Sequence, residues 1–151
     1  MNIEAELKNS KPMPPRQRAL LNILFTASWL DCILQRQLRH FGLTHPQYNI
    51  LRILNGSSPN GRSVLDSKGR MIDRSSNVSR LVEKLRESGY LERVAHTGDR
   101  RMVVVSISEV GKKLLADIQA AGFTDPSRMP GSKLSEAEAT ELAYLLDKFR
   151  D

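Results

Sequence analysis

Hydrophobic residues recur along most of this chain at the spacing of amphipathic helices. In residues 76–88, Val78, Leu81, Val82 and Leu85 follow the i, i+3, i+4, i+7 pattern that places side chains on one face of a helix. The opposite face begins with short polar and basic side chains. We therefore predict a helix over residues 76–88 that buries one side in a core and presents the other side.

The residues that flank this segment are typical of helix boundaries. Asp73, Ser75 and Ser76 are alternative N-caps, because a short side-chain oxygen can accept a hydrogen bond from an N–H group of the first turn. Gly89 stands where a residue in the left-handed conformation ends many helices. The helix is therefore expected to stop just before Gly89.

After this helix the hydrophobic period changes to two residues, which is the period of a β-strand. Leu91, Arg93 and Ala95 alternate with their neighbours, and residues 96–99 have the composition of a turn. The inward residues of the returning segment are Val103, Val105 and Ile107. The sequence thus predicts a β-hairpin with its tip at residues 98–101.

A long helix is predicted over residues 15–41, after a proline pair that suits a first turn and before the helix-ending Gly42. The first dozen residues, which precede it, are polar and are expected to be frayed. The apolar side chains of the long helix lie on several of its faces. Because such a helix needs more than one neighbour, we expect it to pack on its own domain and on another chain.

Two shorter helices are predicted between the long helix and the presented helix. Thr44 and Gln47 have the spacing of a capping box, and Gly56 is expected to end the helix that they start. Ser63, with Asp66 three residues later, is expected to cap the next helix. This helix is expected to hold Val64, Leu65 and Met71.

Two helices are predicted after the hairpin, separated by a long loop over residues 123–133. The first opens at Ser108, and its inward residues are Val110, Leu114, Leu115 and Ile118. The second opens at a capping box of Ser135 and Glu138, and its apolar stripe is Leu142, Leu145, Leu146 and Phe149. The predicted fold class is mainly α with a small β-hairpin wing, and residues 63–88 form a helix-turn-helix unit.

The charge composition indicates what class of partner the protein binds. The chain has 151 residues, which fits one domain, and its net charge of +6 with a sequence pI near 9.8 favours a polyanionic partner. Residues 62–101 hold ten lysine or arginine residues against six acidic ones. No segment approaches the length of a membrane span and no signal peptide is visible, so we expect a cytoplasmic protein with no membrane association.

The sequence offers little for catalysis or metal binding. We find no paired nucleophile and base, no phosphate-binding glycine loop and no carboxylates at a useful spacing, so an enzyme is disfavoured. The three histidines and the one cysteine lack ligand spacing, and we expect neither a metal nor another cofactor. Cys32 is expected to be a buried, inert thiol.

The presented helix carries side chains that can reach DNA bases and phosphates. A capped helix start with a solvated face would also explain them, but the hairpin that follows favours contact with double-stranded DNA. Arg80 is the leading candidate, and Arg62, Lys68 and Arg70 are possible phosphate contacts or merely solvated. The predicted DNA-binding residues of this region are Arg74, Ser75, Ser76, Asn77, Ser79, Arg80 and Lys84.

The predicted hairpin tip is also basic, with Arg100 and Arg101 beside Asp99. Ordinary turn chemistry and a charged rim that discourages pairing with other strands would account for these residues. An arginine in a narrow minor groove would in addition gain from the enhanced negative potential there. Both interpretations can hold, and we favour Arg101 over Arg100 for the groove.

Four motifs resemble the MarR family of bacterial transcription regulators across residues 43–115. They are Leu43-Thr44-x-Pro46-Gln47-Tyr48, Ser76-Asn77-Val78-Ser79-Arg80-Leu81-Val82-x-Lys84-Leu85, Gly89-Tyr90-Leu91-x-Arg93, and Gly98-Asp99-Arg100-Arg101 with Val105-Ser106-Ile107-Ser108-Glu109-x-Gly111. The resemblance implies one MarR-like domain over residues 1–151, with dimerisation helices at 14–42 and 109–151 and a winged helix-turn-helix DNA-binding lobe at 43–108.

The same resemblance implies a homodimer that reads a pseudo-palindromic operator, and we expect a repressor released by a small molecule or another signal. The presented helix would enter the major groove, Arg101 would reach the minor groove, and Asp99 would help to hold the wing tip. The alternative is a winged-helix module that has lost DNA reading and serves as a protein-interaction scaffold, and Asp66 and the unusual residues 69–71 favour it.

An effector cleft between the long helix and the DNA-binding lobe would be expected by analogy with ligand-responsive relatives. Trp29, Cys32 and Tyr48 are its candidate lining residues. Ordinary core packing is the competing interpretation, and we favour it for all three.

Overall fold

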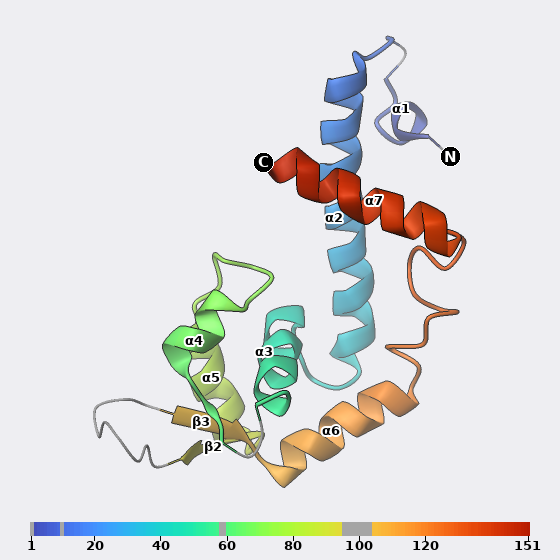
Figure 1. The fold of residues 1–151 in the computed structure, drawn as a ribbon. Helices are drawn as coiled ribbons and strands as arrows, with labels where there is room; N and C mark the ends of the chain where they lie inside the picture. Colours follow the sequence, from blue (N-terminus) through green and yellow to red (C-terminus); the bar gives the residue numbers. More distant parts are fainter. Residues whose placement is uncertain (1, 10, 58–59, 95–103) are drawn as a thin grey trace.

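The protein is described by a computed structural model that covers residues 2–9, 11–57, 60–94 and 104–151. The chain forms mostly helices with one small antiparallel sheet (Figure 1). The helices are α1 (Ile3–Glu6), α2 (Pro15–Arg39), α3 (His45–Asn55), α4 (Val64–Gly69), α5 (Val78–Glu87), α6 (Glu109–Ala120) and α7 (Glu136–Arg150). The strands are β1 (Arg62–Ser63), β2 (Leu91–Val94) and β3 (Val104–Ile107).

The lobe in the lower part of Figure 1 gathers α3, α4, α5 and the sheet, and α2 rises from it as a long separate helix. In the sheet the strand order is β1-β3-β2, with Leu91 opposite Ile107 and Val94 opposite Val104. The antiparallel pairing of β2 with β3 confirms the predicted hairpin. The third strand, β1, was not predicted, because two residues are too few to show a period of two.

The hydrophobic core lies inside this lobe. Ile50, Leu51 and Leu54 of α3 are fully buried and pack with Leu85 of α5 and Ile118 of α6. All four residues of β3 are buried, including Val104 and Ser106, for which strict alternation predicted the outer face. A strand paired on both of its edges and covered by helices has no solvent-facing side, so alternation fails there.

Local capping sets the helix boundaries. At α3, Thr44 accepts a hydrogen bond from the Gln47 N–H at 3.3 Å while the Gln47 side chain accepts one from the Thr44 N–H at 2.8 Å, which confirms the capping box. The same reciprocal pair joins Ser135 and Glu138 at the start of α7. Gly89 follows α5 with φ of +77°, as predicted.

Two apolar residues of the predicted helices point outward. In α4, Leu65 is 79% exposed, whereas Ser67 is fully buried and donates a hydrogen bond to the Ser63 carbonyl oxygen at 2.9 Å. Met71 is buried but lies beyond the end of α4. Val110 of α6 is 58% exposed. The prediction that Val110 faces inward was therefore wrong, although Leu115 and Ile118 of the same helix are buried. In α4, six residues make too few turns for the apolar residues to define one face.

Two further predictions from the N-terminal part were wrong. Residues near the N-terminus were expected to be frayed, but Ile3 is buried and Glu4 forms an ion pair with Arg18 of α2 at 2.6 Å. Cys32 was expected to be buried, but it is exposed on α2. Helix α2 also ends at Arg39, two residues earlier than predicted.

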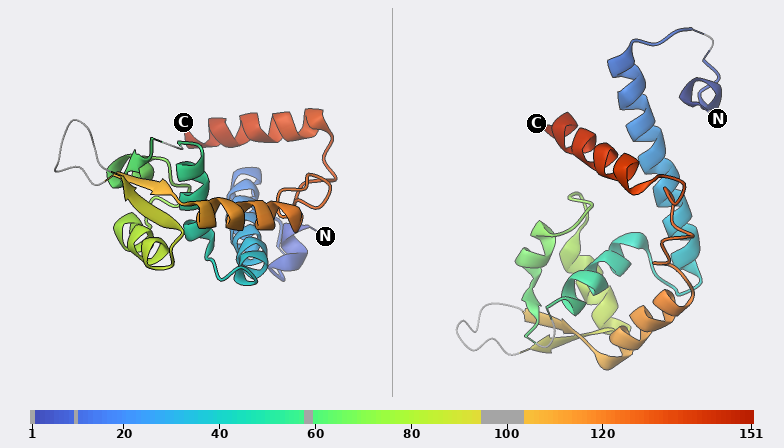
Figure 2. Two further views of the ribbon diagram at one scale, coloured as in Figure 1. Left: turned by 90° about the horizontal axis from the view of Figure 1, so that it is seen from below. Right: turned by 45° about the vertical axis from the view of Figure 1, so that its right-hand side comes forward.

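The last helix stands apart from the rest of the chain. It crosses in front of α2 in Figure 1, but the views in Figure 2 separate the two helices, and α7 has no buried residue. Its apolar residues Leu142, Leu145 and Phe149 are about half exposed. Leu24 and Trp29 of α2 are similarly exposed. No helix in the described part of the chain is both long enough and apolar enough to cross a bilayer.

Candidate nucleic-acid interface

Helix α5 is fixed in the lobe through its apolar face. Val78, Val82 and Leu85 are buried, as the i, i+4, i+7 spacing predicts. The helix begins at Val78, because the side chain of Asn77 accepts a hydrogen bond from the Arg80 N–H at 3.2 Å and serves as the N-cap. The expectation that Asp73, Ser75 or Ser76 would cap this helix was therefore wrong.

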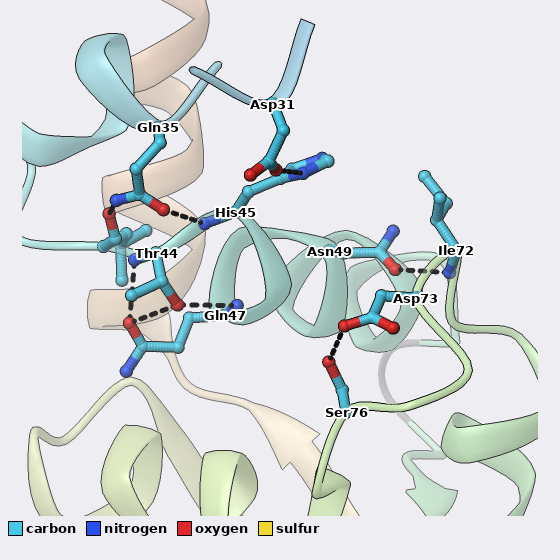
Figure 3. Close-up of polar contacts among 10 residues, drawn as sticks. Asp31, Gln35, Thr44, His45, Gln47, Asn49, Ile72, Asp73 and Ser76 are labelled. Carbon is cyan, nitrogen blue, oxygen red and sulfur yellow. Dashed lines mark hydrogen bonds and ion pairs between the residues drawn. The ribbon is translucent and has the colours of Figure 1, made fainter. Parts of the chain in front are cut away.

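Asp73 instead organises the turn that leads into α5. One of its carboxylate oxygens accepts hydrogen bonds from the Ser75 N–H at 2.9 Å and the Ser75 hydroxyl at 2.6 Å. The other oxygen accepts one from the Ser76 hydroxyl at 2.7 Å, as Figure 3 shows. Donation by the two serines holds the pKa of the Asp73 carboxyl below its ordinary value. The carboxylate is therefore ionised at neutral pH and keeps both serines in place.

The exposed face of α5 carries cations of two kinds. Ser79, Arg80 and Lys84 are exposed, and within the described residues no hydrogen bond or ion pair engages their side chains. Arg86, by contrast, donates to the Glu83 carboxylate at 3.0 and 2.5 Å. This donation from Arg86 lowers the pKa of Glu83. Among the described residues, Arg80 and Lys84 thus have no side-chain partner, whereas Arg86 is paired with Glu83.

The surface is hollowed on both sides of the α5 start. A hollow of about 630 Å³ lies between α4 and α5, where Leu65 and Lys68 face Ser75, Asn77 and Ser79. A second hollow of about 300 Å³ lies between Pro46 at the start of α3 and the residues Ser76, Arg80 and Lys84. Side chains of the predicted DNA-binding set therefore line both hollows. Arg74 is exposed in the turn before them.

The basic tip predicted for the hairpin falls outside the described residues. Asp99, Arg100 and Arg101 lie in the segment 95–103, so the structure does not describe them. Their proposed roles therefore stay predictions. The strands β2 and β3 that lead to this segment are described, and both belong to the same lobe as α5.

A set of polar contacts connects α2 to this surface through α3 (Figure 3). The side chain of Gln35 donates to the Leu43 carbonyl oxygen at 3.3 Å and accepts from the His45 N–H at 3.2 Å. The His45 ring lies 3.2 Å from the Asp31 carboxylate. These residues come from separate elements, so no spacing in the sequence pointed to them.

A second contact continues from α3 to the turn before α5. Asn49 accepts a hydrogen bond from the Ile72 N–H at 3.1 Å, directly beside Asp73. Asn49 lies on α3 and is partly buried, and only the tertiary structure brings it to Ile72. The turn is thus held to α3 by Asn49, and Asp73 binds Ser75 and Ser76 within the turn.

A cleft of about 380 Å³ lies between α2 and the lobe. Its lining is mostly apolar, with four polar side chains, and consists of Ala27, Leu30, Asp31, Leu34, His45, Pro46, Asn49, Met71, Ile72 and Asp73. Trp29, Cys32 and Tyr48 do not belong to this lining. Tyr48 packs in the core with its ring 4.8 Å from that of Phe123, whereas Trp29 is 47% exposed and Cys32 is exposed. The preference for core packing therefore holds for Tyr48 alone.

Comparison with known proteins identifies the lobe. A family model described as a winged helix DNA-binding domain matches residues 43–111. No curated protein matches the chain. Among solved structures, a MarR/EmrR family transcriptional regulator from Acinetobacter sp. ADP1 is 26% identical with a TM-score of 0.71, and the match covers 91% of this chain and 96% of that one.

Two other structures extend the comparison. A MarR transcription factor from Planctomyces limnophilus is 28% identical with a TM-score of 0.67, covering 91% of this chain and 98% of that one. BpsR from Bordetella bronchiseptica is 24% identical with a TM-score of 0.67, and the match covers 85% of this chain and 96% of that one. The DNA binding of BpsR is regulated by 6-hydroxynicotinic acid. The similarity therefore extends beyond the lobe to the flanking helices.

Proposed function

Because this chain belongs to the MarR family of winged-helix transcriptional regulators, we propose that it acts as a homodimer that recognises a pseudo-palindromic DNA operator. Members of this family are DNA-binding regulators and not enzymes. The family membership covers DNA binding and regulation in general. The dimer, the operator and the response to a signal are the parts that we propose.

The observation that carries the proposal is the basic face of α5, whose Arg80 and Lys84 side chains have no partner in the part of the chain that the structure describes. Arg80 and Lys84 project from a helix whose other side is buried in the core, and Ser79 lines the hollow between α4 and α5. Cations with no protein partner can neutralise phosphates, and Arg80 can in addition read a base edge. We assign DNA contacts to this face together with Arg74, and to Arg100 and Arg101 of the wing.

A dimer is supported by the apolar side chains that α2 and α7 leave uncovered. Leu142, Leu145 and Phe149 form one stripe on α7, and no other element of the described chain covers them. Apolar residues gathered at this density on one face favour an interface. Two copies related by a two-fold axis would place their α5 helices about one DNA turn, roughly 34 Å, apart.

The cleft between α2 and the lobe supports the proposed response to a small molecule. It lies against Asn49 and Asp73, which hold the turn before α5, so a molecule bound there can shift the DNA-reading helix. BpsR supplies a precedent for regulation of DNA binding by a small organic acid. We propose a repressor that such a molecule releases, acting in the cytoplasm where bacterial DNA lies.

The test is fluorescence anisotropy with the DNA that flanks the gene of this protein and with a scrambled duplex, across a salt series. We expect tighter binding to the native duplex and a steep loss of affinity with salt. Arg101→Ala should reduce the log–log salt slope by about one unit if this arginine meets the backbone. Weak, equal binding to both duplexes would contradict the proposal and would favour the protein-interaction scaffold.

A further inference from the structure

The hydroxyl groups of Ser75 and Ser76 are already engaged in the protein. Each hydroxyl has one proton to donate, and both protons are directed at the Asp73 carboxylate, at 2.6 and 2.7 Å. Phosphate oxygens and most base-edge acceptors need a donor. Neither serine can therefore donate to DNA without losing its bond to an ionised carboxylate, which is among the stronger kinds of hydrogen bond.

Asp73 is also fixed from the other side. The neighbouring residue Ile72 donates its N–H to Asn49 of α3 at 3.1 Å, so the turn before α5 is attached to the core helix of the lobe. Between Asp73 and the first residue of α5 lie only four positions, and three of these carry the donors or the N-cap just described. These few bonds therefore add to the buried Val78 and Val82 in setting the orientation of the first turn of α5 relative to α3.

We infer that Asp73 is a positioning residue for the DNA-reading helix, and that Ser75 and Ser76 act through Asp73 while Ser79, Arg80 and Lys84 make the contacts. This inference rests on the proposed function and assigns separate roles within its site. The low pKa that the two serines impose on Asp73 keeps the arrangement intact at neutral pH.

Two substitutions separate positioning from charge. Asp73→Asn and Asp73→Ala both remove the negative charge, but only the asparagine retains a side-chain oxygen that accepts from the Ser75 N–H and hydroxyl. Both variants should therefore bind the scrambled duplex at least as tightly as wild type. The ratio of native to scrambled affinity should fall roughly tenfold in Asp73→Ala and much less in Asp73→Asn.

A double-mutant cycle tests the role of the serines. If Ser76 acts through Asp73, then Ser76→Ala should cause little further loss of the affinity ratio in the Asp73→Ala background. If Ser76 contacts DNA itself, the two losses should add. The salt slope should stay unchanged in all of these variants, because none of them removes a phosphate contact.

The chain provides a matched control at Asp125. Its carboxylate accepts from the Ser127 N–H at 2.9 Å and hydroxyl at 2.8 Å, as Asp73 does with Ser75, but it lies in the loop before α7. Asp125→Ala should leave the affinity ratio unchanged. Circular dichroism melting should show that the Asp73 variants remain folded at the assay temperature.

The outcomes distinguish this inference from the proposed function. A wild-type protein that does not prefer the native duplex would overturn the proposed function and the inference with it. A wild-type preference that Asp73→Ala preserves would overturn the inference alone. Equal losses in Asp73→Asn and Asp73→Ala, or additive losses with Ser76→Ala, would also overturn it.

Discussion

Arg80 and Arg86 offer a sharp comparison, because both are arginines on α5 and only one has a protein partner. Arg86 is bound to Glu83, whereas Arg80 has no ion-pair partner among the described residues. We predict that Arg80→Ala will weaken DNA binding far more than Arg86→Ala. The reason is that Arg86 must leave Glu83, or remain half neutralised by it, in order to meet a phosphate.

The size of the difference follows from the exposure of the pair. The side chains of Arg86 and Glu83 are 38% and 44% exposed, so they form a solvent-screened ion pair that Arg86 must break before it meets a phosphate. Loss of one full phosphate contact lowers the salt slope by about 0.9. Between 50 and 200 mM salt this change alters the ratio of mutant to wild-type affinity by about 3.5-fold.

The assay is anisotropy on the native duplex at several salt concentrations, with Glu83→Gln as a third variant. Arg80→Ala should reduce the slope by about one unit, or reduce base discrimination by 1 to 3 kcal/mol if it reads a base. Glu83→Gln should release Arg86 and raise affinity for any duplex. Equal effects of Arg80→Ala and Arg86→Ala, with no gain in Glu83→Gln, would refute the reasoning.

Three further predictions concern stability and assembly. Gly111→Ala should cost about 1 to 3 kcal/mol in chemical unfolding because its Cβ would overlap a backbone carbonyl oxygen, whereas Gly69→Ala has open space and should be neutral or stabilising. Leu145→Glu on the uncovered stripe of α7 should shift light scattering at micromolar concentration from dimer to monomer; an unchanged mass would exclude this face as the interface. Donation by the Ser135 N–H and hydroxyl lowers the pKa of Glu138, so this cap stabilises α7 fully above the unfolded pKa of the carboxyl and is lost as pH falls through the lowered folded value. When the Ser135 amide signal is followed by NMR during acid titration, its midpoint should equal the lowered pKa of Glu138. Glu138→Gln should abolish this titration.

Features that depend on a few neighbouring residues could be predicted from the sequence. The capping boxes at Thr44 and Ser135 and the left-handed Gly89 appear as predicted, since each is decided within one helical turn. The buried face of α5 also follows from local periodicity. The outward orientation of Leu65 did not, because a six-residue helix has no reliable periodicity.

The candidate site was predicted at the level of the helix but not of the individual side chains. The sequence placed Ser75, Ser76 and Arg80 in one DNA-binding set and did not separate their roles, and it gave no sign that Arg86 is paired with Glu83. Their hydrogen bonds divide them into residues held by Asp73, one residue held by Glu83, and one without a partner in the described chain. Composition cannot make this division, because it depends on which side chains come within 3 Å of each other.

The sequence by itself determined the order of the helices, the hairpin and the chemistry of the exposed face of α5, because periodicity and capping act over a few residues. Only the tertiary structure decided what surrounds that face. Asn49 meets Ile72 across 23 positions, and the cleft combines α2, the start of α3 and the turn before α5. Such contacts arise when a shared core brings distant segments together, and no local pattern specifies their partners.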